Sequence, residues 1–240
     1  HFPLPFRNNK FNKHRDMMIS VLTDIYSNSK IAPHLGFKGG TALYFFYKLN
    51  RFSVDLDFDL LDPEKGLLVH ETLLEICSNY GVIKDQALKH FGGLIAMSYQ
   101  KGLHHLKIDV SHRTVNSSYK PKLFLGIPIL VMQLEDMAAN KLLALTERKV
   151  PAARDVFDAY FILQNKIDIT ESIIEGRTGL NLIEYLRKTI DFVENNFDFD
   201  LLDALGELVE HKQKTWVKEK MKQDTIMQLR IRLDSLENCF

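Results

Sequence analysis

Three aspartates, Asp55, Asp57 and Asp59, alternate with apolar residues in the segment "SVDLDFDL" (53–60). Strict alternation is the period of a β-strand, so the carboxylates should point to one face and the apolar side chains to the other. Neighbouring carboxylates on that face would lie roughly 6.6–7 Å apart, which allows two of them to reach one cation or a pair of cations. The pattern indicates an oxygen-rich site for a hard metal ion such as Mg²⁺.

Two other interpretations of the same triplet have to be weighed. An acidic strand is also typical of a sheet edge, where solvated charges discourage aggregation, and the triplet alone supports this interpretation equally well. A calcium loop is the third interpretation, because D-x-D-x-D opens an EF-hand. The spacing excludes it, since the sixth residue from Asp55 is Leu60 instead of Gly and the twelfth is Gly66 instead of Glu.

A second alternating segment, "LHHLKIDVS" (103–111), places Asp109 on the polar face of another strand, with His105, Lys107 and Ser111. In isolation Asp109 is more simply explained as a surface residue. If the two strands pair, however, Asp109 completes a triad with Asp55 and Asp57. Two-metal nucleotidyl transfer needs such a set, with two carboxylates bridging the metals and a third that activates the attacking hydroxyl.

A glycine pair precedes the acidic strand in "KGGTAL" (38–43), and an apolar segment typical of a buried helix follows it. Backbone N–H groups at Gly39, Gly40 and Thr41 can converge on a phosphate at the start of such a helix, and glycine permits close approach. A lone glycine pair is more often only a turn, and no G-K-[ST] follows to make a Walker loop.

Basic residues in the second half of the chain are candidates for binding a triphosphate. Lys141 lies at the edge of the apolar stripe of an expected helix over 134–148, and it is explained equally well as a lysine whose stem packs on the core. Arg154 and Asp158, four residues apart on the next helix, are expected to form a surface pair.

The elements that must position these residues change in character near residue 130. Helices are expected over 12–31, 41–50 and 63–80, and strands over 53–60, 81–87, 94–100 and 103–111. After residue 130 the pattern is helical only, over 134–148, 152–164, 180–195, 201–217 and 220–236. We therefore expect a mixed α/β domain over 1–130 and a helical domain over 131–240.

Composition narrows the class of protein. With 45% hydrophobic and 26% charged residues in 240, the chain is typical of an ordinary globular protein with room for two small domains. Its longest apolar run, over 123–132, is too short to span a bilayer. The first ten residues lack the pattern of a signal peptide, and two cysteines, Cys77 and Cys239, form no disulfide framework, which fits a cytoplasmic protein.

The balance of charge bears on nucleic-acid binding. The chain has 31 basic and 31 acidic side chains and a formal net charge of zero. A protein that binds nucleic acid by broad neutralisation of phosphates usually has an excess of basic residues. Any contact with nucleic acid is therefore expected to be local or transient.

Together these motifs resemble the nucleotidyltransferase superfamily with the polymerase-β-like fold. More closely, they resemble its AbiEii/AbiGii toxin family, the enzymatic half of type IV toxin–antitoxin systems. The resemblance covers about residues 30–165 and implies a nucleotidyltransferase-type mixed α/β (α+β) sheet with flanking helices, followed by a C-terminal helical bundle. The segments that carry it are "KGGTAL" (38–43), "RFSVDLDFDL" (51–60), "KIDVS" (107–111), "LEDMAANKLLALTER" (134–148) and "ARDVFDAY" (153–160).

The resemblance also implies a site. Asp55, Asp57 and Asp109 would be the catalytic and metal-binding carboxylates, with Asp109 as the general base. Many superfamily members have a phosphate-binding serine where this chain has Gly40, so a backbone N–H must replace it here. The nucleotide-binding set implied by the family's motifs is Lys38, Gly39, Gly40, Thr41, Ser53, Lys141, Arg154 and Asp155.

The activity that the resemblance implies is transfer of an NMP from an NTP to an acceptor, with Mg²⁺ or in its place Mn²⁺. The resemblance favours tRNA as the acceptor and leaves a protein as the alternative. It also implies an antitoxin as a partner. The sequence itself predicts no association with a membrane, and it leaves the oligomeric state open. The rival interpretation is a non-catalytic nucleotide-binding or partner-binding protein that retains the fold.

Overall fold

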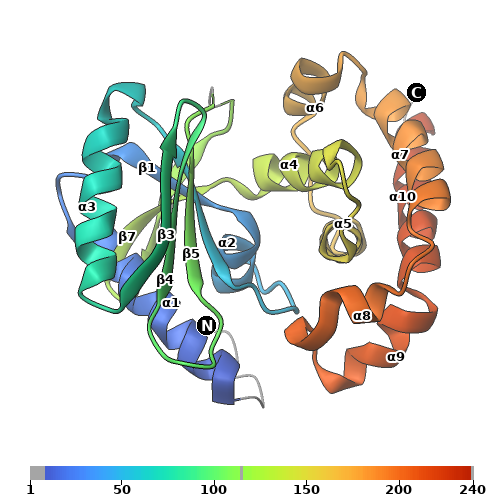
Figure 1. The fold of residues 1–240 in the computed structure, drawn as a ribbon. Helices are drawn as coiled ribbons and strands as arrows, with labels where there is room; N and C mark the ends of the chain where they lie inside the picture. Colours follow the sequence, from blue (N-terminus) through green and yellow to red (C-terminus); the bar gives the residue numbers. More distant parts are fainter. Residues whose placement is uncertain (1–8, 114–115, 239–240) are drawn as a thin grey trace. The chain divides into compact units, whose positions relative to one another are not determined.

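The computed structural model of the chain describes residues 9–113 and 116–238. Residues 1–8, on which most of the expectation about a signal peptide rests, and Cys239 lie outside the described residues. Two compact units divide the chain (Figure 1): unit 1 consists of residues 1–48 and 52–133, and unit 2 of residues 49–51 and 134–240. No described helix has both the length and the apolar character needed to cross a bilayer.

Unit 1 is built on a mixed sheet, as expected for the fold class. In the described residues it has seven strands in the order β3-β4-β5-β2-β1-β7-β6. The pairs β2–β5 and β1–β7 are parallel, and the other neighbours are antiparallel. The strands are β1 (Leu35–Lys38), β2 (Asp55–Leu60), β3 (Val82–Lys89), β4 (Gly92–Ser98), β5 (Leu106–Ser111), β6 (Tyr119–Phe124) and β7 (Ile127–Met132).

Helices cover the sheet of unit 1. Figure 1 shows α3 and α2 on opposite sides of it, and α1 packs against α3 as well as against β2, β5 and β7. Helix α2 follows β1 directly and packs on β1 and β2. The helical elements of this unit are α1 (Asn9–Ser27), η1 (Ala32–His34), α2 (Gly39–Phe46), η2 (Pro63–Lys65) and α3 (Gly66–Ser78).

Alternation along the strands decides where the core of unit 1 lies. Leu56 and Phe58 on β2 and Ile108 on β5 are buried. On the opposite face Asp57 is half-buried and Asp109 is exposed. The apolar side chains therefore form the core beneath the sheet, and the carboxylates are left on the other face.

The expected strands of unit 1 are present with shifted ends, but strand β1 and one hairpin were not expected. The apolar run over 123–132 folds into β6 and β7, which pair antiparallel around Leu125 and Gly126. Both of these residues have positive φ, 52° and 84°. Positive φ at both central residues is the geometry of a two-residue hairpin turn, and leucine at the first position is an unusual choice that concealed the turn.

Unit 2 is helical, with two differences from expectation. Helix α6, which ends at Gly179 in the left-handed conformation, was not expected. The expected helix over 201–217 is broken at Gly206, which has a φ of 57°. The elements are α4 (Leu134–Glu147), α5 (Ala153–Gln164), α6 (Glu171–Thr178), α7 (Leu182–Asn196), α8 (Leu201–Leu205), η3 (Gly206–Leu208), α9 (His211–Glu219) and α10 (Met221–Glu237).

Candidate functional site

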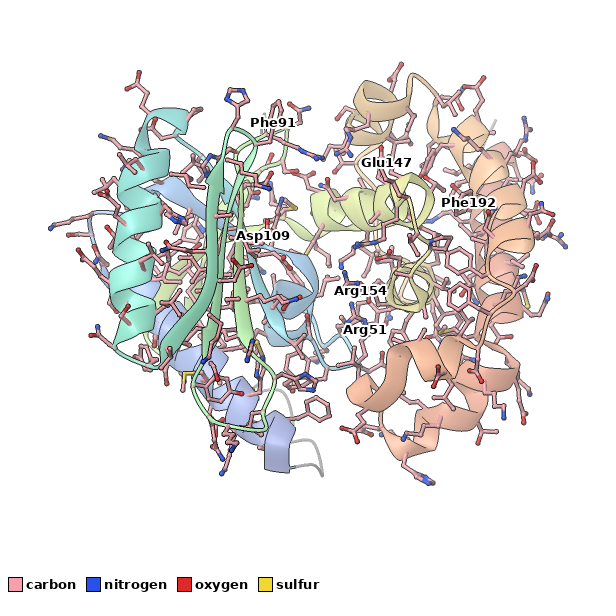
Figure 2. All side chains as sticks on the ribbon, in the orientation of Figure 1. Arg51, Phe91, Asp109, Glu147, Arg154 and Phe192 are labelled. Carbon is pink, nitrogen blue, oxygen red and sulfur yellow. The ribbon has the colours of Figure 1, made fainter. Side chains whose placement is uncertain are left out.

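Parallel pairing of β2 with β5 brings the predicted carboxylates together on one face of the sheet. Asp57 is the direct partner of Asp109, and Asp55 is the partner of Lys107. Neighbouring strands lie about 4.7–4.9 Å apart, so Asp57 and Asp109 are the nearest neighbours in this set and Asp55 is one step along the same face. Figure 2 shows Asp109 on the sheet of unit 1.

The electrostatics of Asp109 reflect this crowding. Partial desolvation raises the pKa of the Asp109 carboxyl above its usual value, and the negative charge of Asp57 raises it further. Lys38 and Arg113 oppose this shift in pKa without cancelling it. The charge of Asp57 thus repels that of Asp109, and a cation bound between the two carboxylates would relieve this repulsion.

The glycine turn at the end of β1 lies directly against Asp57. Gly39 has a φ of 82°, a conformation that side chains with a Cβ rarely adopt. A Cβ atom at this position would lie 2.3 Å from Oδ2 of Asp57. Glycine is therefore required here both by the positive φ and by the lack of space for a Cβ atom. Without a side chain, the backbone of Gly39 can lie directly against the Asp57 carboxylate.

Three further residues of the predicted nucleotide-binding set are buried. Gly40 is buried in the first turn of α2, and Ser53 is buried two residues before β2. Thr41 is fully buried, and its Oγ1 donates a hydrogen bond of 2.5 Å to the carbonyl oxygen of Asp55. The hydroxyl of Thr41 therefore ties the first turn of α2 to the start of β2.

Asp59, the third aspartate of the triplet, has a different environment from the other two. It is buried, and its Oδ1 lies 2.5 Å from Nζ of Lys38. The hydroxyl of Tyr119 donates a hydrogen bond to its Oδ2. Asp59 thus holds Lys38 beside the carboxylate pair. Tyr119 had no signal in the sequence, because it reaches the site only through the unexpected hairpin.

Lys141 and Asp155, two of the predicted residues of the helical half, form ion pairs inside unit 2 that each include a buried carboxylate. Nζ of Lys141 lies 2.7 Å from Oδ2 of Asp158, and Arg51 donates to both carboxylate oxygens at 2.7 and 2.8 Å (Figure 2). Burial would raise the pKa of Asp158, but the charges of Arg51 and Lys141 outweigh it and lower the pKa to about 2. The expected surface pair of Arg154 with Asp158 is therefore wrong: Arg154 is exposed, whereas Asp158 is fully buried.

Asp155, the other acidic residue predicted on α5, is also buried. Its Oδ2 accepts a hydrogen bond of 2.5 Å from Nε of Arg148. Its Oδ1 has no hydrogen-bond partner among the described residues. Arg51 was overlooked as a partner of α5, although a charged residue within the apolar stripe of "DVFDAYFI" (155–162) was a sign that a buried cation must exist nearby.

The donors available for a metal ion are the paired carboxylates. Within residues 9–113 and 116–238, no group of three His, Cys, Asp or Glu side chains is arranged to hold an ion. Asp57 and Asp109 fit a hard cation by donor type and by their mutual repulsion, and Asp55 is the next oxygen donor on the same face.

Comparison with known families gives one match that covers most of the chain. Residues 20–234 match the sequence model of the family described as nucleotidyl transferase AbiEii toxin, type IV TA system. Among proteins with curated descriptions, no significant match was found.

Solved structures with a similar fold include two from Helicobacter pylori. One is a provisionally assigned nucleotidyltransferase, with 21% sequence identity and a TM-score of 0.64, aligned over 97% of this chain and 99% of that chain. The other is JHP933, with 20% identity and a TM-score of 0.62 over 96% of this chain and 95% of that chain. At this level of identity the likeness establishes the fold.

Proposed function

Because the chain belongs to the AbiEii nucleotidyl transferase toxin family of type IV toxin–antitoxin systems, we propose that it transfers an NMP from an NTP to an acceptor and releases pyrophosphate, with the help of a divalent cation. The observation that carries this proposal is the direct pairing of Asp57 with Asp109, with the Gly39 turn against Asp57. Together these place a pair of carboxylates next to a backbone able to approach a phosphate closely.

In this proposal two carboxylates bind the cation and the third acts as the general base. Asp55 and Asp57 would hold Mg²⁺, or Mn²⁺ in its place, which would supply positive charge next to the triphosphate. Asp109 takes the proton from the attacking hydroxyl of the acceptor. In the metal-free protein the pKa of the Asp109 carboxyl is raised, and a raised pKa makes a carboxylate a stronger base.

We assign the triphosphate to the turn between β1 and α2. Gly39, Gly40 and Thr41 would offer backbone N–H groups at the start of α2, where the helix dipole also favours an anion. Lys38, held by Asp59, adds a fixed positive charge beside the carboxylates. Ser53 lies just before β2 and completes the set in unit 1.

The assignments in unit 2 follow from the family motifs. Arg154 is exposed on α5 and would be the cation most accessible to a nucleotide. Lys141 is held in place by Asp158, so it would act as a fixed charge and not as a mobile one. Asp155 would act indirectly, through the orientation of Arg148.

The acceptor that we favour is tRNA, with a protein side chain as the alternative. Membership of a toxin–antitoxin family implies an antitoxin as a partner. The rival to catalysis is a protein that binds nucleotides or a partner without turnover. Turnover itself discriminates between the two.

The deciding experiment incubates the protein with each α-³²P-labelled NTP, Mg²⁺ and total tRNA, followed by gel analysis. Asp57→Asn should abolish transfer and leave the fold intact, because it removes a metal ligand at an exposed face. Asp85→Asn, at an exposed aspartate on β3, is the matched control and should be fully active. Label in RNA or protein that persists in D57N would refute the mechanism, and NTP binding without any label would favour the non-catalytic rival.

A further inference from the structure

A cavity of about 460 Å³ lies in unit 1 beyond the end of β5. It is lined by Pro63, His90, Phe91, His112 and Arg113. His90 and Phe91 form the turn between β3 and β4, and Figure 2 shows Phe91 at the tip of this hairpin. The backbone N–H of His112 donates a hydrogen bond of 3.1 Å to the carbonyl oxygen of Phe91, so the two sides of the cavity are joined.

Two residues of the cavity lie close enough to Asp109 for their charges to interact: Arg113 opposes the rise in the pKa of Asp109, and Asp109 opposes the fall in the pKa of His112. His112 and Arg113 follow β5 directly and are only three and four residues beyond Asp109. At about 3.3 Å per residue, this is a distance of roughly 10–13 Å. Stacked nucleotides in one strand repeat about every 3.4 Å, so a few nucleotides would span the path from the cavity to Asp109.

The lining has the chemistry that binds single-stranded nucleic acid. Phe91 is 66% exposed, an unusual position for a large aromatic residue. The ring of His90 packs edge-on against it, with centroids 4.5 Å apart and an interplanar angle of 77°. The side chain of Arg113 is exposed on the same cavity. An exposed ring on which a base can stack, next to a guanidinium that can bind a phosphate, is the usual combination for this ligand.

His112 gives the cavity a rigid, uncharged wall. A Cβ atom on Gly66 would lie 3.1 Å from Cε1 of His112, so the imidazole packs against the first turn of α3. Burial lowers the pKa of His112, and His70 and His90 lower it further, while Asp109 opposes them. At neutral pH the ring is therefore a neutral hydrogen-bonding group, suited to the edge of a base, and Arg113 is the residue suited to a phosphate.

We propose that this cavity is an acceptor subsite, in which a base near the reacting end of a single-stranded RNA stacks on Phe91 and its phosphate binds Arg113. The inference rests on the proposed transferase function and deepens it, because it gives an RNA acceptor a binding subsite and a direction of approach along β5 toward Asp109. A single exposed arginine also agrees with a chain of zero net charge, which can contact nucleic acid only locally.

The test is a fluorescence anisotropy titration without NTP, using a fluorescein-labelled single-stranded RNA of eight nucleotides with a free 3′ hydroxyl. Loss of one stacking contact weakens binding by about tenfold, so Phe91→Ala should weaken RNA binding by that factor. Arg113→Ala should weaken it to a similar extent. Phe91→Tyr keeps an aromatic ring and should bind RNA as the unmodified protein does. The matched controls are Leu123→Ala, at an exposed leucine on β6, and Lys84→Ala, at an exposed lysine on β3. Affinities for F91A and R113A that equal those of the controls would overturn the proposal, as would an unmodified protein that does not bind this RNA.

A second readout separates this inference from the proposed function. In the transfer assay, F91A and R113A should raise the KM for RNA and leave the KM for NTP unchanged. Normal transfer to RNA with an unchanged KM for RNA in both variants would overturn the subsite alone. Absence of transfer by the unmodified protein would instead count against the transferase function, and the anisotropy titration would still decide whether the cavity binds RNA.

Discussion

At the scale of single residues, the site depends on how closely a backbone and a carboxylate approach each other. Gly39 combines positive φ with a position where a Cβ would lie 2.3 Å from Asp57 Oδ2. Gly126 has nearly the same φ, 84°, but open space around it. Comparing substitutions at the two glycines therefore separates the loss of stability caused by the backbone conformation from the displacement of the Asp57 carboxylate.

Gly39→Ala should abolish nucleotidyl transfer, whereas Gly126→Ala should keep it. Both substitutions place a Cβ in the left-handed region, and each should destabilise the fold by about 1–2 kcal/mol. Only G39A pushes Asp57 out of position as well. Transfer rates and urea unfolding of the two variants check this, and a G39A protein as active as G126A would contradict the close approach.

Asp109 predicts a dependence of stability on pH. Its carboxyl has a raised pKa in the fold, so at neutral pH its charge destabilises the protein when no divalent cation is bound. Asp109→Asn should therefore raise the melting temperature in EDTA at pH 7 and abolish transfer. The gain should shrink as the pH falls through the raised pKa and vanish below the unfolded value of 3.8. A gain that persists at lower pH would show that the charge is not its cause.

At the scale of elements, the ion pairs of Asp158 tie three segments of unit 2 together. Arg51 comes from the segment 49–51, Lys141 from α4 and Asp158 from α5. The carboxylate is fully buried, Arg51 is nearly so, and Lys141 is half-buried. Removing it would leave two charges in the interior without compensation, which is far more costly than the loss of an exposed pair.

Asp158→Asn should lower the free energy of unfolding by about 3–5 kcal/mol at pH 7. Its pKa is about 2 in the fold against 3.8 otherwise, so the contribution is complete above 3.8 and is lost as the pH falls toward 2. Urea unfolding at pH 7 checks the magnitude. Asp198→Asn, which breaks the exposed pair with Lys222, is the control and should cost only about 0–1 kcal/mol. Equal losses in both variants would show that the buried network adds little.

At the scale of the whole molecule, the sequence was informative where structure depends on local periodicity. The alternation in 53–60 and 106–111 identified both strands of the site, because the period of side chains along a strand is a local property. The register that pairs Asp57 with Asp109 joins segments far apart in sequence. The sequence predicted this triad only if the two strands are neighbours in the sheet, and it did not predict that they are. Arg51 and Asp158 are 107 positions apart, and nothing in a local pattern specifies such a partner.

The interleaving of the two units along the chain limits how this protein can be cut or recombined. Residues 49–51 lie between α2 and β2 in sequence yet are part of unit 2, so the polypeptide passes between the units after Lys48, after Arg51 and after Gln133. If two relatives exchanged gene segments at residue 133, the residue at position 51 would come from one parent and the residue at position 158 from the other. The buried aspartate of one parent would then depend on an arginine supplied by the other parent. Chimeras joined at residue 133 should therefore fold stably only where both parents have arginine at position 51 and aspartate at position 158.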